Sequence, residues 1–165
     1  MRLAGYTDFD WAGFASDRKS TSGCCFGLGS AVVSWFNRKQ QSVALSSAEA
    51  EYMAASLASC EAIWLRKMLF GLFGQPLRPS VIYCDNQSCI KLTENPVFHD
   101  RSKHISIRYH FIRDYVQKGV VKPEYIPIDE KLADIITKAL PRGKHVYFRD
   151  KMGVVRNTFL GKREC

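Results

Sequence analysis

The sequence lacks any long hydrophobic run. No apolar stretch approaches the ~18 residues of a membrane span, and the opening residues MRLAGYTDF contain no apolar segment typical of a secretion signal. CxxC pairs and the Cys/His spacings of zinc sites are also missing among the six cysteines. We therefore expect reduced thiols without zinc, no membrane association, and an intracellular location, cytoplasmic or nuclear.

The composition gives no sign of disorder. The 165 residues are 46% apolar and 24% charged, which is enough for the core of one folded unit. We expect a domain over residues 1–141, followed by a basic C-terminal extension over residues 142–165 that is helical in part.

The net charge of +8 is concentrated in two segments. Residues 99–122 carry six lysines and arginines against two acids, and residues 138–165 carry eight against two, so the remainder of the chain is net negative. Basic flanks around a mildly acidic centre are typical of a protein that grips a polyanion while carboxylates and cations carry out the chemistry. An ordinary solvated basic surface is the alternative.

Three antiparallel strands are predicted before the first helix. Residues 2–9 alternate in character and lead into DFDWAG, so we expect a strand that terminates in acids, Asp8 and Asp10, which could share a face. After the turn-rich segment DRKSTSG, the apolar runs CCFGLG and AVVSWF are separated by a glycine and a serine, which indicates a hairpin.

A long helix is predicted from about Ser47 to Leu69, because Ser46 and Glu49 form a capping box. Within this helix, Glu51 shares a stripe with small residues, which are Ala54, Ala55 and Ala58. Glu49 lies about 200° away around the helix, so only Glu51 faces the packed side. The alternative is that both glutamates merely complement the helix dipole.

A further acid follows a buried strand. VIYCD, which ends at Asp85, arrives from a helix and is predicted to run parallel to the first strand. Asn86 then caps a short helix, QSCIKLTEN. Because ligand sites in open α/β sheets lie beyond the carboxyl ends of parallel strands, Asp8 and Asp85 are predicted to meet.

The last third of the chain is predicted to contain two helices and an edge strand. ISIRYHFIRDYVQKG has one apolar stripe and a basic outer face, and KPEYIPI is a proline-marked strand. Asp129 is predicted to cap a last helix, EKLADIITKAL, in which Asp134 lies near the middle at the margin of the apolar face.

Four carboxylates therefore form the candidate site, at Asp8, Glu51, Asp85 and Asp134. Clustered acids should repel one another in the metal-free fold, and divalent cations would neutralise them. An all-oxygen site suits Mg²⁺ or Mn²⁺ rather than zinc. The pattern predicts a two-metal phosphodiesterase, in which one cation activates a water and the other stabilises the leaving 3′ oxygen. Asp10 is the alternative to Asp8 as the first ligand.

Six motifs within about residues 5–155 are informative as a set. They are YTDFDWAG, DRKSTSG, SWFNRKQQSVALSSAEAEYMA, IYCDNQSCIKL, NPVFHDRSKHISIRYHFIRD and LADIITKALP. Taken together they resemble the ribonuclease H domain of Ty1/copia-type retrotransposon polyproteins. The resemblance implies an α/β, ribonuclease H-like fold, with a five-stranded mixed sheet of three antiparallel and then two parallel strands, flanked by helices. It also implies cleavage of the RNA strand of RNA/DNA hybrids with two Mg²⁺ ions per site, for which Mn²⁺ is a substitute.

The same resemblance implies residue roles. Matching motif to motif places the catalytic, metal-binding acids on the four candidates, Asp8, Glu51, Asp85 and Asp134. Many ribonucleases H carry a histidine in the loop before the last acid, whereas VVKPEYIPIDEKLAD has none. This difference concerns the expected turnover rate and not the chemistry of cleavage.

Contacts to nucleic acid are predicted at the start of the short helix and in the basic segment after it, at Asn86, Gln87, Ser88, His99, Arg101, Lys103, His104 and Arg108. His99 and His104 form either a phosphate clamp or part of a solvated loop. Trp11, Trp35 and Trp64 are predicted to lie in the core rather than to stack on bases.

The sequence thus predicts an endonuclease, a ribonuclease H, that leaves 3′-hydroxyl and 5′-phosphate ends. The expected partners are an RNA/DNA hybrid and the reverse transcriptase portion of a parent polyprotein. A catalytically weak or inactive, domesticated nucleic-acid-binding module of the same fold is the alternative, and a structural role in a larger particle is a third. The presence of all four acids favours the enzyme.

Overall fold

The computed structural model describes residues 2–10, 19–44, 46–94 and 103–154. Five strands form one sheet in the order β3-β2-β1-β4-β5, and they are β1 Leu3–Asp10, β2 Thr21–Leu28, β3 Ala31–Lys39, β4 Ser80–Cys84 and β5 Val121–Tyr125. The first three strands pair antiparallel, while β4 is parallel to β1 and β5 is parallel to β4. The predicted mixed sheet is confirmed, and the KPEY part of KPEYIPI lies in its edge strand β5 while IPI follows that strand.

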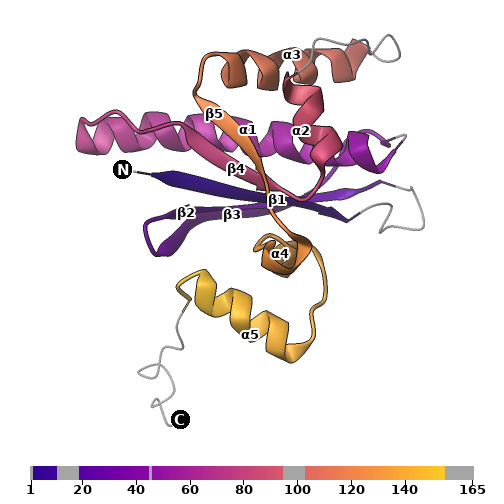
Figure 1. The fold of residues 1–165 in the computed structure, drawn as a ribbon, viewed down its shortest axis with the longest axis vertical. Coiled ribbons are helices and arrows are strands. Elements are labelled where there is room, and N and C mark those ends of the chain that lie inside the picture. The colour runs from indigo at the N-terminus through magenta and orange to yellow at the C-terminus, as the bar shows by residue number, and fades with distance from the viewer. Residues whose placement is uncertain (1, 11–18, 45, 95–102, 155–165) are drawn as a thin grey trace, which may run out of the picture.

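Helices cover both faces of the sheet. On one face lie α1 Ser47–Phe73, α2 Gln87–Glu94 and α3 Lys103–Gln117, and on the other lie α4 Asp134–Thr137 and α5 Arg142–Lys151 (Figure 1). A 3-10 turn, η1 Ile128–Glu130, leads from β5 to α4. None of the helices in the described part of the chain is long and apolar enough to cross a membrane.

The long helix α1 begins where the capping box predicts. The Ser46 side chain accepts a hydrogen bond from the Glu49 backbone N–H, and the helix ends at Gly74, whose φ of 65° is the left-handed conformation that favours glycine. The predicted stripe of small residues is confirmed, because Ala54, Ala55 and Ala58 are all buried. This stripe lets α1 lie close against β1 and β2.

The predicted last helix is broken, and Asp129 does not cap it. Lys131 ends the 3-10 turn with extended backbone angles, φ −72° and ψ 92°, and only Asp134–Thr137 form α4 before Lys138 is extended again. Asp134 therefore starts a short helix instead of lying in the middle of a long one. Lys131, which lies at this break, is buried, and its ammonium contacts Asp8 on β1.

The helix α5 is packed on the second face of the sheet. Phe148 is fully buried in one cluster with Cys25 and Leu132. The helix therefore contributes to the core, although the domain boundary predicted at residue 141 stays a prediction.

The expected burial of the tryptophans is wrong for the two that the structure describes. Trp35 on β3 is 64% exposed and Trp64 on α1 is 56% exposed. Both lie in apolar stretches of sequence but on the solvent side of their elements, and Trp11 lies outside the described residues. None of the described cysteines is in a disulfide bond, and all but Cys60 are buried.

Candidate active site

Two of the predicted acids lie at the ends of neighbouring parallel strands. The pairing of Tyr6 with Tyr83 places the carboxyl ends of β1 and β4 side by side. Asp8 is completely buried near the end of β1, and the Asp85 side chain directly after β4 is 18% exposed. Their proximity is the consequence of the parallel topology that the sequence predicts.

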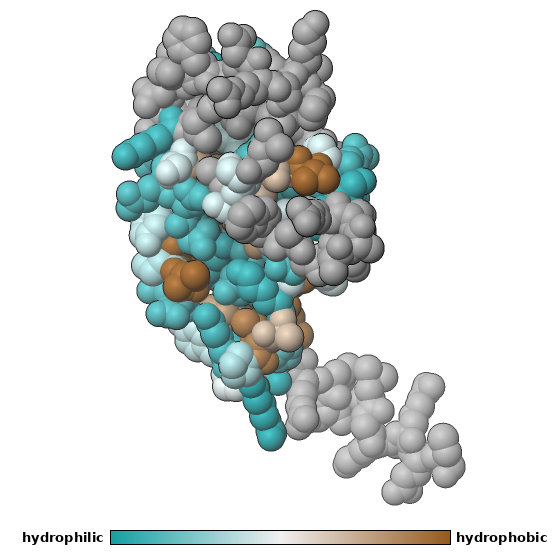
Figure 2. All heavy atoms as spheres, turned by 90° about the vertical axis from the view of Figure 1, so that its right-hand side faces the viewer, coloured by the Kyte–Doolittle hydropathy of each residue, from teal (hydrophilic) through white to brown (hydrophobic). Residues whose placement is uncertain are grey.

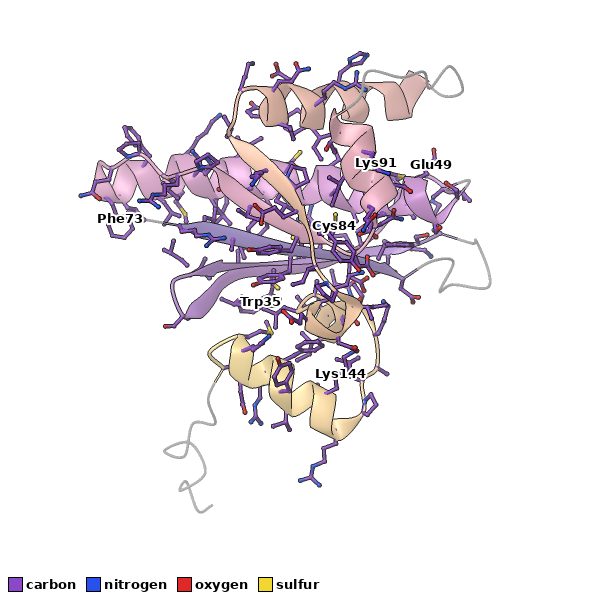
Figure 3. All side chains as sticks on the ribbon, in the orientation of Figure 1. Trp35, Glu49, Phe73, Cys84, Lys91 and Lys144 are labelled. Atoms are coloured by element: carbon purple, nitrogen blue, oxygen red, sulfur yellow. The ribbon has the colours of Figure 1, made fainter. Side chains whose placement is uncertain are left out.

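Glu51 faces this strand edge from α1, as its helical position predicts. Its side chain is completely buried, whereas Glu49 lies on the outer side of the helix (Figure 3). Both Glu51 carboxylate oxygens are without a hydrogen-bond partner within the described part of the chain. Burial raises the pKa of Glu51 well above its usual value, and the nearby carboxylate of Asp85 adds to the effect.

The fourth acid, Asp134, enters from the opposite face of the sheet. It is 4% exposed at the start of α4. The short helix approaches β2 so closely that a Cβ atom on Gly23 would lie 2.4 Å from Thr137 Cγ2, so a glycine is needed there. This approach lets the Thr137 hydroxyl donate a hydrogen bond to Asp8 Oδ2.

Two lysines lie among the four acids. The Lys131 ammonium, on a side chain that is 1% exposed, contacts Asp8 Oδ1 and lies 2.9 Å from Asp85 Oδ1. The Lys138 ammonium lies 3.2 Å from Asp8 Oδ2 and 3.5 Å from Asp134 Oδ1. The lysines offset the repulsion expected among the acids but do not remove it, because, in addition to burial, Asp85 raises the pKa of Glu51 and Asp8 raises the pKa of Asp134.

At Asp8 and Lys131 the ion pairs shift the pKa in the direction opposite to the effect of burial. Burial alone would raise the pKa of Asp8, but the attraction and hydrogen bond of Lys131, together with Thr137 and Lys138, lower it. Burial alone would lower the pKa of Lys131, and the Glu51 and Asp8 carboxylates raise it instead. The pKa of Asp134 is raised by burial and by Asp8.

The donor chemistry of the cluster fits a divalent cation. Four carboxylates offer only oxygen ligands, which Mg²⁺ and Mn²⁺ prefer, and the Glu51 oxygens are buried without a donor among the described residues. In that same part of the chain, however, no three acid, histidine or cysteine side chains stand together so that they could hold an ion. These side chains are of the kind that binds a divalent cation, but in the structure Asp8, Asp85 and Asp134 are paired with lysines.

The structure describes only some of the residues that are predicted to contact nucleic acid. Asn86 Oδ1 accepts hydrogen bonds from the backbone N–H groups of Ser88 and Cys89, so Asn86 caps α2 as predicted. Gln87 and Ser88 are exposed. His99 and Arg101 lie outside the described residues, and for Lys103, His104 and Arg108 only the α3 backbone is described. Their roles stay predictions.

The surface at this edge is mainly polar. The carboxyl end of β1 points towards the side of the molecule that Figure 2 faces, where the coloured atoms are mostly hydrophilic and hydrophobic residues form separate patches. Lys144 on α5 lies on the same side and reaches to 3.9 Å from Asp134 Oδ2 (Figure 3).

Sequence reasoning missed the lysines and Thr137. Lys138 could have been found, because it follows Asp134 by four residues, a spacing that pairs side chains on a helix. Lys131 gave no such signal, since a lysine beside a turn is usually solvated. Its place in the site depends on the break between η1 and α4.

Solved structures of ribonuclease H domains share this fold. The N-terminal RNase H domain of rv2228c from Mycobacterium tuberculosis superposes with a TM-score of 0.60 over 90% of this chain and 96% of that chain, at 11% sequence identity. LC11-RNase H1 in complex with an RNA/DNA hybrid gives a TM-score of 0.52 over 79% of this chain and 88% of that chain, at 11% identity. The chain has a ribonuclease H fold, as predicted.

Sequence relatives give the family. The chain is 44% identical over 94% of its length to the retrovirus-related Pol polyprotein from transposon RE1 of Arabidopsis thaliana, and 42% identical over 94% to that from transposon TNT 1-94 of Nicotiana tabacum. It spans only 11% and 12% of the lengths of these relatives. No family model matches the chain. The chain is a homologue of Ty1/copia-type retrovirus-related Pol polyproteins, as its motifs predict.

Proposed function

We propose that the chain is a ribonuclease H, a metal-dependent endonuclease that hydrolyses the RNA strand of RNA/DNA hybrids by a two-metal-ion mechanism. The observation that carries this proposal is the convergence of Asp8, Glu51, Asp85 and Asp134 from separate segments into one charge-linked cluster. Homology to Pol polyproteins and the fold of ribonuclease H domains support it. A solved relative in fold was crystallised with an RNA/DNA hybrid, which supports the substrate.

Mg²⁺ is the proposed cofactor, with two ions per site and Mn²⁺ as a substitute. The four carboxylates would hold the ions. Bound ions would supply an activated water and stabilise the charge on the leaving oxygen.

The proposed reaction is hydrolysis at phosphorus. The oxygen of a water bonds to phosphorus while the bond from phosphorus to the 3′ oxygen breaks. That oxygen takes up a proton, so the products carry a 3′-hydroxyl and a 5′-phosphate. The RNA strand would be distinguished by its 2′-hydroxyl.

The chain itself supplies positioning for this chemistry. The Thr137 hydroxyl donates a hydrogen bond that orients the Asp8 carboxylate, and burial of Glu51 on the inner face of α1 keeps bulk water away from its oxygens. Asp8 is held by β1, Glu51 by α1 and Asp134 by α4, and Asp85 directly follows β4, so regular elements position the acids.

The partners and location are also proposals. An RNA/DNA hybrid would lie along the basic segments, and the reverse transcriptase portion of a parent polyprotein would act with this domain. An intracellular location, cytoplasmic or nuclear, stays a prediction.

One observation favours the alternative of a domesticated binding module. The ammonium groups of Lys131 and Lys138 contact the carboxylates that would hold the ions. If they cannot be displaced, the chain would bind hybrids without cutting them.

A cleavage assay with labelled RNA decides between the two functions. RNA paired with DNA should be cut in Mg²⁺ or Mn²⁺ and remain intact in EDTA, and the same RNA in a duplex with RNA should remain intact throughout. End analysis should find 3′-hydroxyl and 5′-phosphate groups. Binding of the hybrid without cleavage in either metal would instead support the binding module.

A further inference from the structure

A lysine side chain is buried at the centre of the carboxylate cluster. Lys131 is 1% exposed, and its ammonium contacts Asp8 and Asp85 and lies 5.9 Å from the centre of the Phe9 ring. Burying an ammonium is costly unless charged partners compensate for the lost hydration. The two carboxylates provide that compensation.

The ammonium contacts two of the carboxylates that would hold a cation. It lies between acids from adjacent parallel strands and uses one oxygen of Asp8 and one of Asp85. Close by, the buried Glu51 carboxylate has no hydrogen-bond partner within the described residues. A divalent cation that used the same two oxygens would meet strong repulsion from the ammonium.

The backbone that carries Lys131 lies near the surface, because Asp129 and Glu130 just before it are both exposed on the 3-10 turn. Lysine carries its charge on a flexible four-carbon stem, so release of the ammonium would need a change of side-chain rotamer and no refolding of the strands. Lys138, which is 37% exposed, already occupies a position at the rim.

We propose that Lys131 is a tethered counter-cation that stabilises the metal-free site and must leave Asp8 and Asp85 before a divalent cation binds there. This inference rests on the proposed function, because it takes these acids as metal ligands. Lys131 thereby lowers the metal affinity of the site. It also sets the metal concentration above which the site is loaded.

Direct measurement of Mn²⁺ binding tests this proposal. The full chain, the Lys131→Gln variant and a Lys122→Gln control are titrated with Mn²⁺, and free Mn²⁺ is followed by electron paramagnetic resonance. Lys122 is a suitable control because it also pairs with a carboxylate, Glu124, but is exposed on the edge strand. Lys131→Gln should bind Mn²⁺ about tenfold more tightly than the parent, and Lys122→Gln should match the parent.

A second measurement on the parent protein remains informative if Lys131→Gln fails to fold. Lysines are acetylated briefly in EDTA or in Mg²⁺ and the modified sites are mapped by mass spectrometry. Lys131 should be protected in EDTA and modified in Mg²⁺, while Lys122 should be modified equally in both.

The possible failures are distinguishable. In a parent that binds Mn²⁺, either equal or weaker Mn²⁺ binding by folded Lys131→Gln or equal protection of Lys131 in EDTA and Mg²⁺ would overturn the role of Lys131 and leave the proposed function intact. If neither the parent nor Lys131→Gln bound Mn²⁺, the metal-dependent function itself would fail, and the inference with it.

Discussion

Asp85 shows how the neighbours of a single residue reverse an expectation. Repulsion among four acids predicts that Asp85→Asn is at least as heat-stable as the parent in EDTA. In the structure Asp85 is 2.9 Å from the buried Lys131 ammonium, so neutralising it removes a partner from a buried charge. The variant should lose about 1–3 kcal/mol of stability in EDTA, as well as its cleavage activity.

Melting curves in EDTA check this prediction. Asp114→Asn is a matched control, because Asp114 pairs with Lys118 on the exposed face of α3 and such pairs contribute little. A melting temperature for Asp85→Asn at or above that of the parent would restore the repulsion account.

At the scale of elements, the face of α1 is predicted to decide which glutamate takes part in the proposed reaction. Glu51 is completely buried towards the strand ends, whereas Glu49 is partly exposed on the outer side. Glu51→Gln should therefore reduce hybrid cleavage by at least about a hundredfold, and Glu49→Gln should retain most activity. Rates are compared at saturating hybrid and Mg²⁺. Equal losses would show that the helix face does not distinguish the two.

The helix α5 gives a second prediction at this scale. Phe148 is fully buried against the second face of the sheet, and its neighbour Tyr147 is 47% exposed. Phe148→Ala should lower the free energy of unfolding by about 3–5 kcal/mol, and Tyr147→Ala by about 1 kcal/mol or less. Denaturant unfolding measures both. Similar small effects would mean that residues 142–165 are an appendage rather than part of the folded unit.

At the scale of the whole molecule, the basic segments are predicted to hold nucleic acid by its phosphates. Replacing Arg101 and Lys103 together by alanine should weaken hybrid binding and reduce the slope of log affinity against log salt by about 2. Cleavage at saturating hybrid should be unchanged. An unchanged salt slope would mean that neither side chain contacts phosphate.

Much of the fold follows from local signals in the sequence. The capping box at Ser46, the glycine-containing hairpin and the strand-end acids are short-range patterns, and they correctly gave α1, the antiparallel strands and the place of Asp8 beside Asp85. Glu51 followed from helical spacing alone.

The rest depends on contacts between distant segments. Lys131 follows the 3-10 turn and pairs with acids that lie more than forty residues away in the sequence. The exposure of Trp35 and Trp64 depends on which face of an element is left uncovered. The spacing of apolar residues within one segment shows neither of these features.

The central claim is that Asp8 and the other three acids perform the chemistry, and a pair of variants on one strand tests it most directly. Asp8 is completely buried in the cluster, and Asp10, the alternative ligand two residues on, is only partly buried at the strand end. The cleavage rate of a saturating RNA/DNA hybrid in Mg²⁺ should fall at least about a hundredfold in Asp8→Asn and remain near that of the parent in Asp10→Asn. An active, folded Asp8→Asn would contradict the account.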